Sequence, residues 1–188
     1  MTGLGHTEPL QTKAETNDES PQPEKCLDGT NCKSQQGSDI HHETINANKL
    51  IVGDSITRHV KASKMFPRTS VDHRKIYTIA QAIDAAKVFI SPSVDTVVYH
   101  IGTNDLMSGK SPAECIDQMV ELVDTTTNNM PNANIVISDV LKRHNNKNVN
   151  DNVQEFNLLL FNKMKLRKKV TIVKHNELSA NSELFDDD

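Results

Sequence analysis

The stretch Thr-Val-Val-Tyr-His-Ile-Gly-Thr-Asn-Asp, residues 96–105, decides the fold of this chain. It is a β-branched run that stops at a glycine, a pattern typical of a strand followed by a sharp turn. A second stretch of the same kind, Lys-Leu-Ile-Val-Gly-Asp-Ser, occupies residues 49–55. The apolar residues in both runs are consecutive and do not alternate with polar ones. Both runs therefore predict strands of a parallel sheet that is buried on its two faces.

Apolar runs alternate with helical patterns around these two stretches. Further strands are predicted at 71–77, 134–138 and 170–173, and apolar residues at helical spacing predict helices over about 79–90, 112–123 and 149–164. The middle helix opens with a capping box, Ser111-Pro112-Ala113-Glu114, with proline at the first helical position. This order predicts an α/β domain with right-handed crossovers, in which ligands bind beyond the carboxyl ends of the strands.

The first 47 residues differ in composition from the rest of the chain. They hold three basic and eight acidic residues and no aromatic residue, while the whole chain has a net charge of −4. Such a segment cannot bury enough apolar surface to offset its ordering entropy, so we expect residues 1–47 to be a disordered tail and residues 48–188 to be the folded domain.

Composition and the N-terminus exclude several classes of protein. No run approaches the ~20 apolar residues of a membrane-spanning helix. The folded part is nearly neutral, which gives no global reason to expect nucleic acid as a partner. The N-terminus has no basic region followed by an apolar one, and the three cysteines make no disulfide framework. We therefore expect an intracellular, cytoplasmic protein with reduced thiols.

The two stretches that decide the fold each end in a short motif. Gly53-Asp54-Ser55 comes at the end of one predicted strand, and Gly102-Thr103-Asn104-Asp105 comes at the end of another. A serine at this place presents its hydroxyl at the mouth of the site, where backbone N–H groups can face a developing oxyanion. The side chain of Asn104 can add another N–H donor to the same oxyanion hole. The two motifs together are a far more specific signal than either alone.

At these residues the chain resembles the SGNH (GDSL-type) hydrolase family, and in particular members found in invertebrates and mobile elements. The resemblance runs from Lys49 to the end of the chain and includes residues 137–143. It implies a flavodoxin-like, three-layer αβα sandwich with a five-stranded parallel sheet. It also implies a serine hydrolase that acts on acyl esters or acylated glycans without a cofactor or metal. The residues that it implies for the site are the nucleophile Ser55 and the binding or oxyanion residues Gly53, Asp54, Thr78, Gly102 and Asn104.

Two parts of that machinery depart from the family pattern. The family has a glycine after its second strand, and here Thr78 stands in that region with no glycine between Gly53 and Gly102. The family also has an Asp-x-x-His motif near its C-terminus. Asp188 aligns with this aspartate as a provisional triad member, and the histidine would lie beyond the last residue. We therefore expect a C-terminally truncated domain with negligible esterase activity.

Other histidines and charged residues have alternative interpretations. His144 and His175 follow predicted strands, so either is a candidate substitute base, whereas His100 is expected to be a satisfied core histidine and His59 a helix-surface residue. Asp54 and Asp105 could suggest a metal site, but helix capping is the favoured interpretation. The basic cluster at 163–169 has two interpretations. The favoured one is a cation-rich helix C-terminus that complements the helix dipole, and the other is a contact with RNA. The alternative functions are a non-catalytic binding domain of the same fold and an RNA-binding protein of mobile-element origin.

Overall fold

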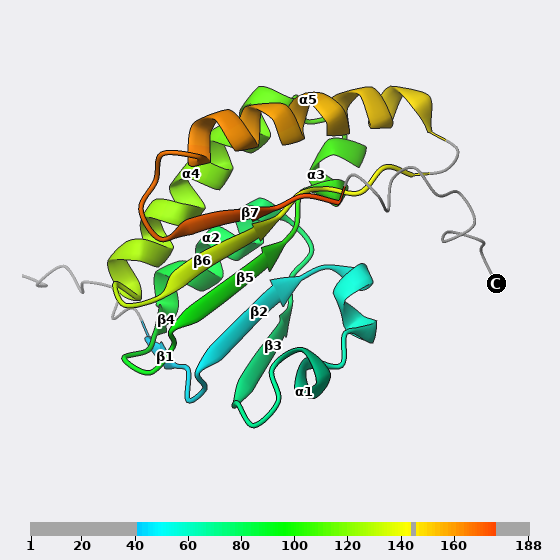
Figure 1. Cartoon of the computed structure of the whole chain (residues 1–188). Coiled ribbons are helices and arrows are strands. Elements are labelled where there is room, and N and C mark those ends of the chain that lie inside the picture. Colours follow the sequence, from blue (N-terminus) through cyan, green and yellow to red (C-terminus); the bar gives the residue numbers. More distant parts are fainter. Residues whose placement is uncertain (1–40, 144–145, 176–188) are drawn as a thin grey trace, which may run out of the picture. The chain divides into compact units, whose positions relative to one another are not determined.

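The computed structural model describes residues 41–143 and 146–175 of the 188-residue chain. Its centre is a five-stranded sheet in which every neighbouring pair of strands is parallel. This confirms the predicted α/β class and the five parallel strands (Figure 1). In spatial order the strands are β3 (Val71–Lys75), β2 (Lys49–Gly53), β5 (Thr96–His100), β6 (Asn134–Ser138) and β7 (Val170–Val173).

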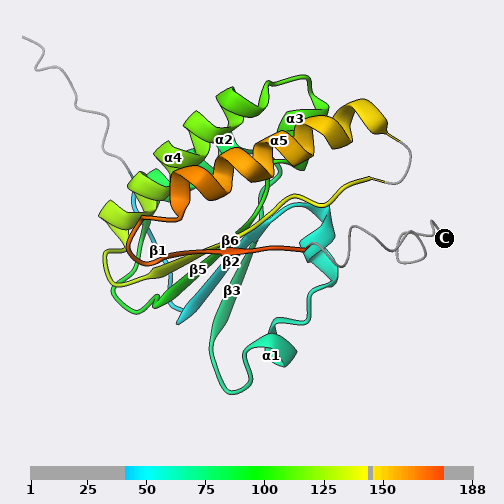
Figure 2. The ribbon, with the colours of Figure 1, turned by 45° about the horizontal axis from the view of Figure 1, so that its top comes forward.

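Long helices cover one face of this sheet. Figure 1 and Figure 2 show α2 (Ile79–Val88), α4 (Pro112–Asn129) and α5 (Lys147–Met164) on the same side, with α4 packed against both of the others. The strand residues that face these helices are fully buried, among them Leu50, Val97 and Ile135. The main hydrophobic core therefore lies between the sheet and these helices.

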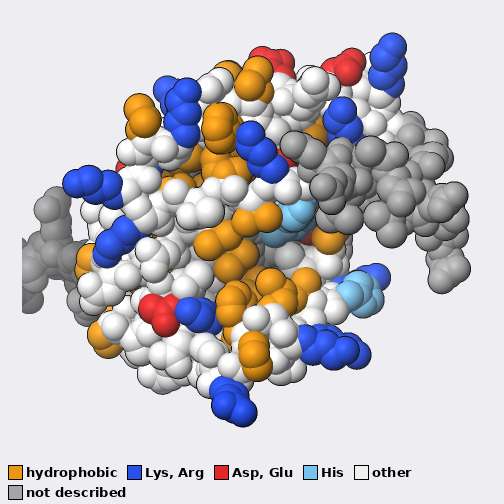
Figure 3. All heavy atoms as spheres, viewed as in Figure 1, with side chains coloured by type: hydrophobic (Ala, Val, Ile, Leu, Met, Phe, Trp, Pro, Cys, Tyr) orange, Lys and Arg blue, Asp and Glu red, His pale blue; other side chains and the backbone are white. Residues whose placement is uncertain are grey.

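The opposite face carries a thinner layer. It consists of the 3-10 segment η1 (Ser55–His59) and the one-turn helix α1 (Ala62–Met65), which contact β2 and β3. The sheet thus lies between helical segments, in agreement with the predicted αβα sandwich. Figure 3 shows hydrophobic side chains exposed across the middle of the view, where this thin layer does not extend over the sheet.

Two very short strands pair near the start of the described residues. β1 (Glu43–Thr44) pairs in parallel with β4 (Phe89–Ile90), and Ile45 behind it is 1% exposed. Glu43, Thr44 and Ile45 therefore belong to the folded part, although they precede the expected boundary at residue 48. The helix predicted over about 79–90 is shorter in the structure. It ends at Val88, and Phe89 and Ile90 form strand β4 instead. The rest of the expected tail, residues 1–40, lies outside the described residues.

Local signals explain where the other elements begin and end. The capping box at Ser111 is present, since the Ser111 hydroxyl accepts from the Glu114 N–H and the Glu114 carboxylate accepts from the Ser111 N–H. Strand β3 ends two residues earlier than predicted because the chain must turn to place Thr78 as the N-cap of α2, with its hydroxyl accepting from the Gln81 N–H. Within the described ranges, no helix is long and apolar enough to cross a membrane.

Candidate functional site

Ser55 lies where the order of the strands reverses. β2 has β3 on one side and β5 on the other, so the chain leaves the first strand in one direction and later returns to its other side. In α/β sheets the crevice at this point is where ligands bind. Ser55 is exposed and is the first residue of η1, and the buried Asp54 caps that segment by accepting the Ile56 N–H at 3.0 Å.

The Thr57 side chain, in the same turn, leaves no room for a Cβ at position 53. A Cβ at this position would lie 2.3 Å from Cγ2 and 2.6 Å from Oγ1 of Thr57, closer than real atoms approach. The Thr57 hydroxyl is itself held in place, since it donates to the Asp54 carbonyl at 2.9 Å and lies 3.1 Å from Nε2 of His73. His73 was not singled out from the sequence, because nothing in its local pattern marks it as a partner of η1.

The asparagine motif forms a second turn at the same edge of the sheet. Gly102 has φ +117°, a left-handed conformation that side chains disfavour, and it begins the short helix α3 (Thr103–Met107). The amide of Asn104 donates to the Tyr77 carbonyl at 2.9 Å. This bond ties the end of β5 to the loop after β3, next to Thr78. Of the proposed oxyanion residues, Asn104 and Thr78 therefore lie close together.

Asp105 binds helix α2 to the end of β5. Its buried carboxylate accepts the Ile79 N–H at 3.0 Å and the Lys110 ammonium at 2.8 Å. The carboxylates of Asp54 and Asp105 thus accept hydrogen bonds from backbone N–H groups at the starts of helical segments, which agrees with the capping interpretation. The residues that the structure describes contain no group of three or more acidic, histidine or cysteine side chains suited to a metal ion.

A second polar cluster lies at the carboxyl ends of β5, β6 and β7. The Ser138 hydroxyl is 2.6 Å from Nδ1 of His100 and 2.7 Å from Nε2 of His175. Asp139 accepts the His175 backbone N–H at 3.0 Å, and the same carboxylate oxygen lies 4.0 Å from Nε2 of His175. Sequence reasoning did not single out Ser138, although its place at the end of a predicted strand was an available signal.

Burial shifts the titration of two members of this cluster. Desolvation lowers the pKa of His100 from its ordinary value and outweighs the opposing attraction of Asp54. Desolvation also raises the pKa of Asp139, and the neighbouring His175 opposes this shift. His100 was expected to be a satisfied core histidine, and this is only half correct. Its Nε2 is buried with no hydrogen-bond partner among the residues that the structure describes, while its Nδ1 hydrogen-bonds the Ser138 hydroxyl.

Ser55 and His175 are the predicted catalytic residues that lie in the described part of the chain, and no hydrogen bond joins them there. His175 hydrogen-bonds Ser138, and the hydrogen bonds among the described residues include none to the Ser55 hydroxyl. His144 and Asp188, the other candidates for the triad, lie outside the described residues. Site assembly around Ser55 is therefore an open prediction, whereas the contacts of Ser138 are defined.

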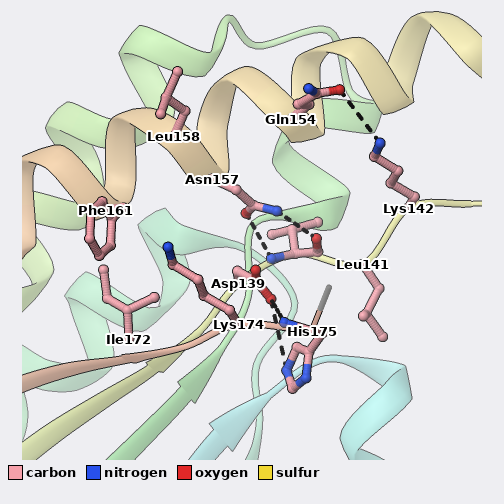
Figure 4. Close-up of a pocket in the computed structure, with 11 residues that line it drawn as sticks. Asp139, Leu141, Lys142, Gln154, Asn157, Leu158, Phe161, Ile172, Lys174 and His175 are labelled. Atoms are coloured by element: carbon pink, nitrogen blue, oxygen red, sulfur yellow. Dashed lines mark hydrogen bonds and ion pairs between the residues drawn. The ribbon is translucent and has the colours of Figure 1, made fainter. Parts of the chain in front are cut away.

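Two hollows adjoin the polar cluster. One is a groove of about 370 Å³ on the thinly covered face of the sheet, with an almost wholly apolar lining that ends at His100, Ser138 and His175. The other, of about 270 Å³, lies between α5 and the ends of β6 and β7 (Figure 4). In Figure 4, Asn157 holds the backbone of Val140 by two hydrogen bonds, both of 2.9 Å.

The basic cluster near the end of α5 makes contacts within the domain. Arg167 pairs with Asp124, and the Lys169 ammonium donates to the Pro131 carbonyl at 2.8 Å. Lys165 lies 5.9 Å from the centre of the Phe161 ring. Arg167, Lys169 and Lys165 thus have contacts within the domain.

Neither a protein-family model nor a curated protein matches this chain. Solved structures do. A protein from Streptococcus pneumonia proposed to be a platelet activating factor is 18% identical, with a TM-score of 0.61, and the match covers 72% of this chain and 69% of that one. A member of the lipolytic protein G-D-S-L family from Veillonella parvula is 13% identical, with a TM-score of 0.56, over 67% of this chain and 76% of that one. The chain therefore has the fold of these proteins.

Proposed function

We propose that residues from Lys49 onward form an SGNH-type ester hydrolase-like domain whose ancestral activity is acyl-ester hydrolysis at Ser55. The observation that supports this most directly is the position of Ser55, exposed at the start of η1 and at the point where the strand order reverses. The similar fold of a lipolytic G-D-S-L family member is consistent with it.

Ser55 in this chain is expected to turn over esters negligibly. A serine hydroxyl is a weak nucleophile unless a base lies within hydrogen-bond reach, about 2.6–3.2 Å. In the described part of the chain His175 serves Ser138 instead, and Asn104 directs its amide at the Tyr77 carbonyl. Thr78 stands where the related enzymes have a glycine. It keeps its backbone N–H, but its Cβ narrows the approach to that donor, and an oxyanion donor that cannot be reached typically costs about 10²–10³ in rate.

The test is p-nitrophenyl acetate hydrolysis by the wild type and by Ser55→Ala. We expect equal rates, because an unactivated Ser55 contributes nothing measurable. Substantial turnover that Ser55→Ala removes would contradict the proposal and would show that a base reaches Ser55.

A non-catalytic binding domain of the same fold is the second candidate. The groove of about 370 Å³ favours it, since an apolar hollow of this size with a few polar groups at one end is typical of a ligand site. Saturable binding of an apolar ligand without turnover would support this candidate.

A further inference from the structure

A second serine lies at the carboxyl edge of the sheet with an imidazole on either side. Ser138 is the last residue of β6, its hydroxyl lies 2.7 Å from Nε2 of His175 beyond β7, and it lies 2.6 Å from Nδ1 of His100 on β5. A basic nitrogen at this distance is what activates a serine for nucleophilic attack. We propose that Ser138 and His175 form a second nucleophilic centre, distinct from Ser55, that accepts apolar acyl groups from esters.

The hydrogen bonds of His100 direct the serine proton toward His175. Nε2 of His100 is buried and has no hydrogen-bond partner among residues 41–143 and 146–175, so a proton on that nitrogen would leave an unpaired buried N–H group there, which is rare in proteins. The proton therefore belongs on Nδ1, which donates to the Ser138 oxygen. The serine hydroxyl has one proton to donate, and its acceptors are His175 at 2.7 Å and the Asp139 carbonyl at 3.2 Å. The shorter bond points to His175.

Asp139 holds His175 in place and supplies the compensating charge. Its carboxylate accepts the His175 backbone N–H at 3.0 Å, which fixes the chain just after β7. The same oxygen lies 4.0 Å from Nε2, so it stabilises the imidazolium that forms when His175 takes a proton. The His175 side chain is 24% exposed, so it can exchange that proton with solvent.

The groove next to Ser138 defines the class of substrate. His100, Ser138 and His175 line one end of it. The other lining residues are apolar, including Val98, Val136 and Phe66, except for Thr57 and Thr96. Its volume of about 370 Å³ suits an aliphatic chain whose ester carbonyl lies at the polar end. Polar or charged acyl groups would lose their hydration on entering it.

The reaction balances with water as the only co-reactant. The Ser138 oxygen bonds to the acyl carbon while its proton passes to Nε2 of His175. The bond between the acyl carbon and the alkoxy oxygen then breaks, and the alcohol leaves with that proton. Water next attacks the acyl-serine, and His175 again accepts and returns one proton, which releases the carboxylic acid and restores Ser138.

The test is labelling of the full chain with a long-chain alkyl fluorophosphonate, followed by peptide mass spectrometry. In this reaction the Ser138 oxygen bonds to phosphorus and fluoride leaves, so the adduct identifies the nucleophile without any variant. We expect the adduct on Ser138. We also expect faster labelling by the long-chain reagent than by a methyl analogue, since only the former fills the groove.

His175→Gln keeps a hydrogen-bonding group near Ser138 but removes the base. It should slow labelling of Ser138 by about 10²–10⁴-fold, the usual contribution of a general base. Ser70→Ala, which alters an exposed serine away from the cluster, is the matched control and should leave the rate unchanged.

An unlabelled Ser138 peptide, or a labelling rate that His175→Gln does not change, would overturn the inference. An adduct on Ser55 bears only on the proposed inactivity of that serine. The same experiment therefore tests the two proposals separately. The Ser138 peptide tests the second nucleophilic centre, and the Ser55 peptide tests the inactivity of Ser55.

Discussion

Replacement of Gly53 by alanine tests why the turn after β2 contains a glycine. The new Cβ would lie 2.3 Å from Cγ2, 2.6 Å from Oγ1 and 2.9 Å from Cβ of Thr57. Carbon atoms pack best at about 3.5–4.0 Å, so Thr57 must move by about 1 Å or more. Overpacking of this kind typically costs about 1–3 kcal/mol.

Thr57 cannot move without losing its hydrogen bonds to the Asp54 carbonyl and to His73. Each such bond is worth about 1 kcal/mol, which places the expected cost of Gly53→Ala near 3 kcal/mol. In a Thr57→Ala background both of the atoms that overlap most are absent, so the same change should cost only about 1 kcal/mol. The two substitutions should therefore be less than additive by about 2 kcal/mol.

The assay is urea unfolding of the wild type, both single variants and the double variant, followed by far-ultraviolet circular dichroism. Gly109→Ala is the matched control, because a Cβ there meets no atom within 4 Å while the φ of +92° makes alanine unfavourable. Its cost should add to that of Thr57→Ala within about 0.5 kcal/mol. An equally additive result for Gly53→Ala would refute the steric explanation of this glycine.

Three further changes test the contacts around the site. Asp105→Ala leaves the first N–H of α2 without its acceptor and removes the ion pair of Lys110, whose ammonium keeps only its bond to Gln118, and we expect a loss of about 2–4 kcal/mol in the free energy of unfolding, measured in urea. Asn157→Ala removes the two hydrogen bonds to the Val140 backbone after β6, and it should lower the free energy of unfolding by roughly 2–3 kcal/mol in the same assay. Burial lowers the pKa of His100, so the unfolded chain binds more protons than the folded one, and the free energy of unfolding should fall as the pH drops below about 6.5. His100→Gln should weaken that fall, and urea midpoints at pH 8 and pH 5.5 that shift equally in both proteins would contradict it.

Strands and helices with strong local signals could be predicted from the sequence. The strands at Asn134–Ser138 and Val170–Val173 are bounded as expected, because each is a short apolar run between polar residues. The start of the helix at Pro112 is also as expected, because its capping box operates over only four residues, whereas the helix continues to Asn129, beyond the predicted end near residue 123. The two-residue strands β1 and β4 could not be predicted, since each forms only by pairing with a partner far along the chain.

The parallel sheet, and with it the shared edge of the two motifs, follows from the sequence by itself. The continuous apolar runs predict a parallel sheet with helices on its faces, and Gly53-Asp54-Ser55 and Asn104 follow two of those runs. The structure alone shows that Gly53 makes room for Thr57 and that His175 meets Ser138, 37 residues earlier in the chain. The physical reason is that hydrogen bonds and steric contacts act over a few ångströms. Which distant residues come that close depends on the order β5-β6-β7 in the sheet, and no local pattern of residues encodes that order.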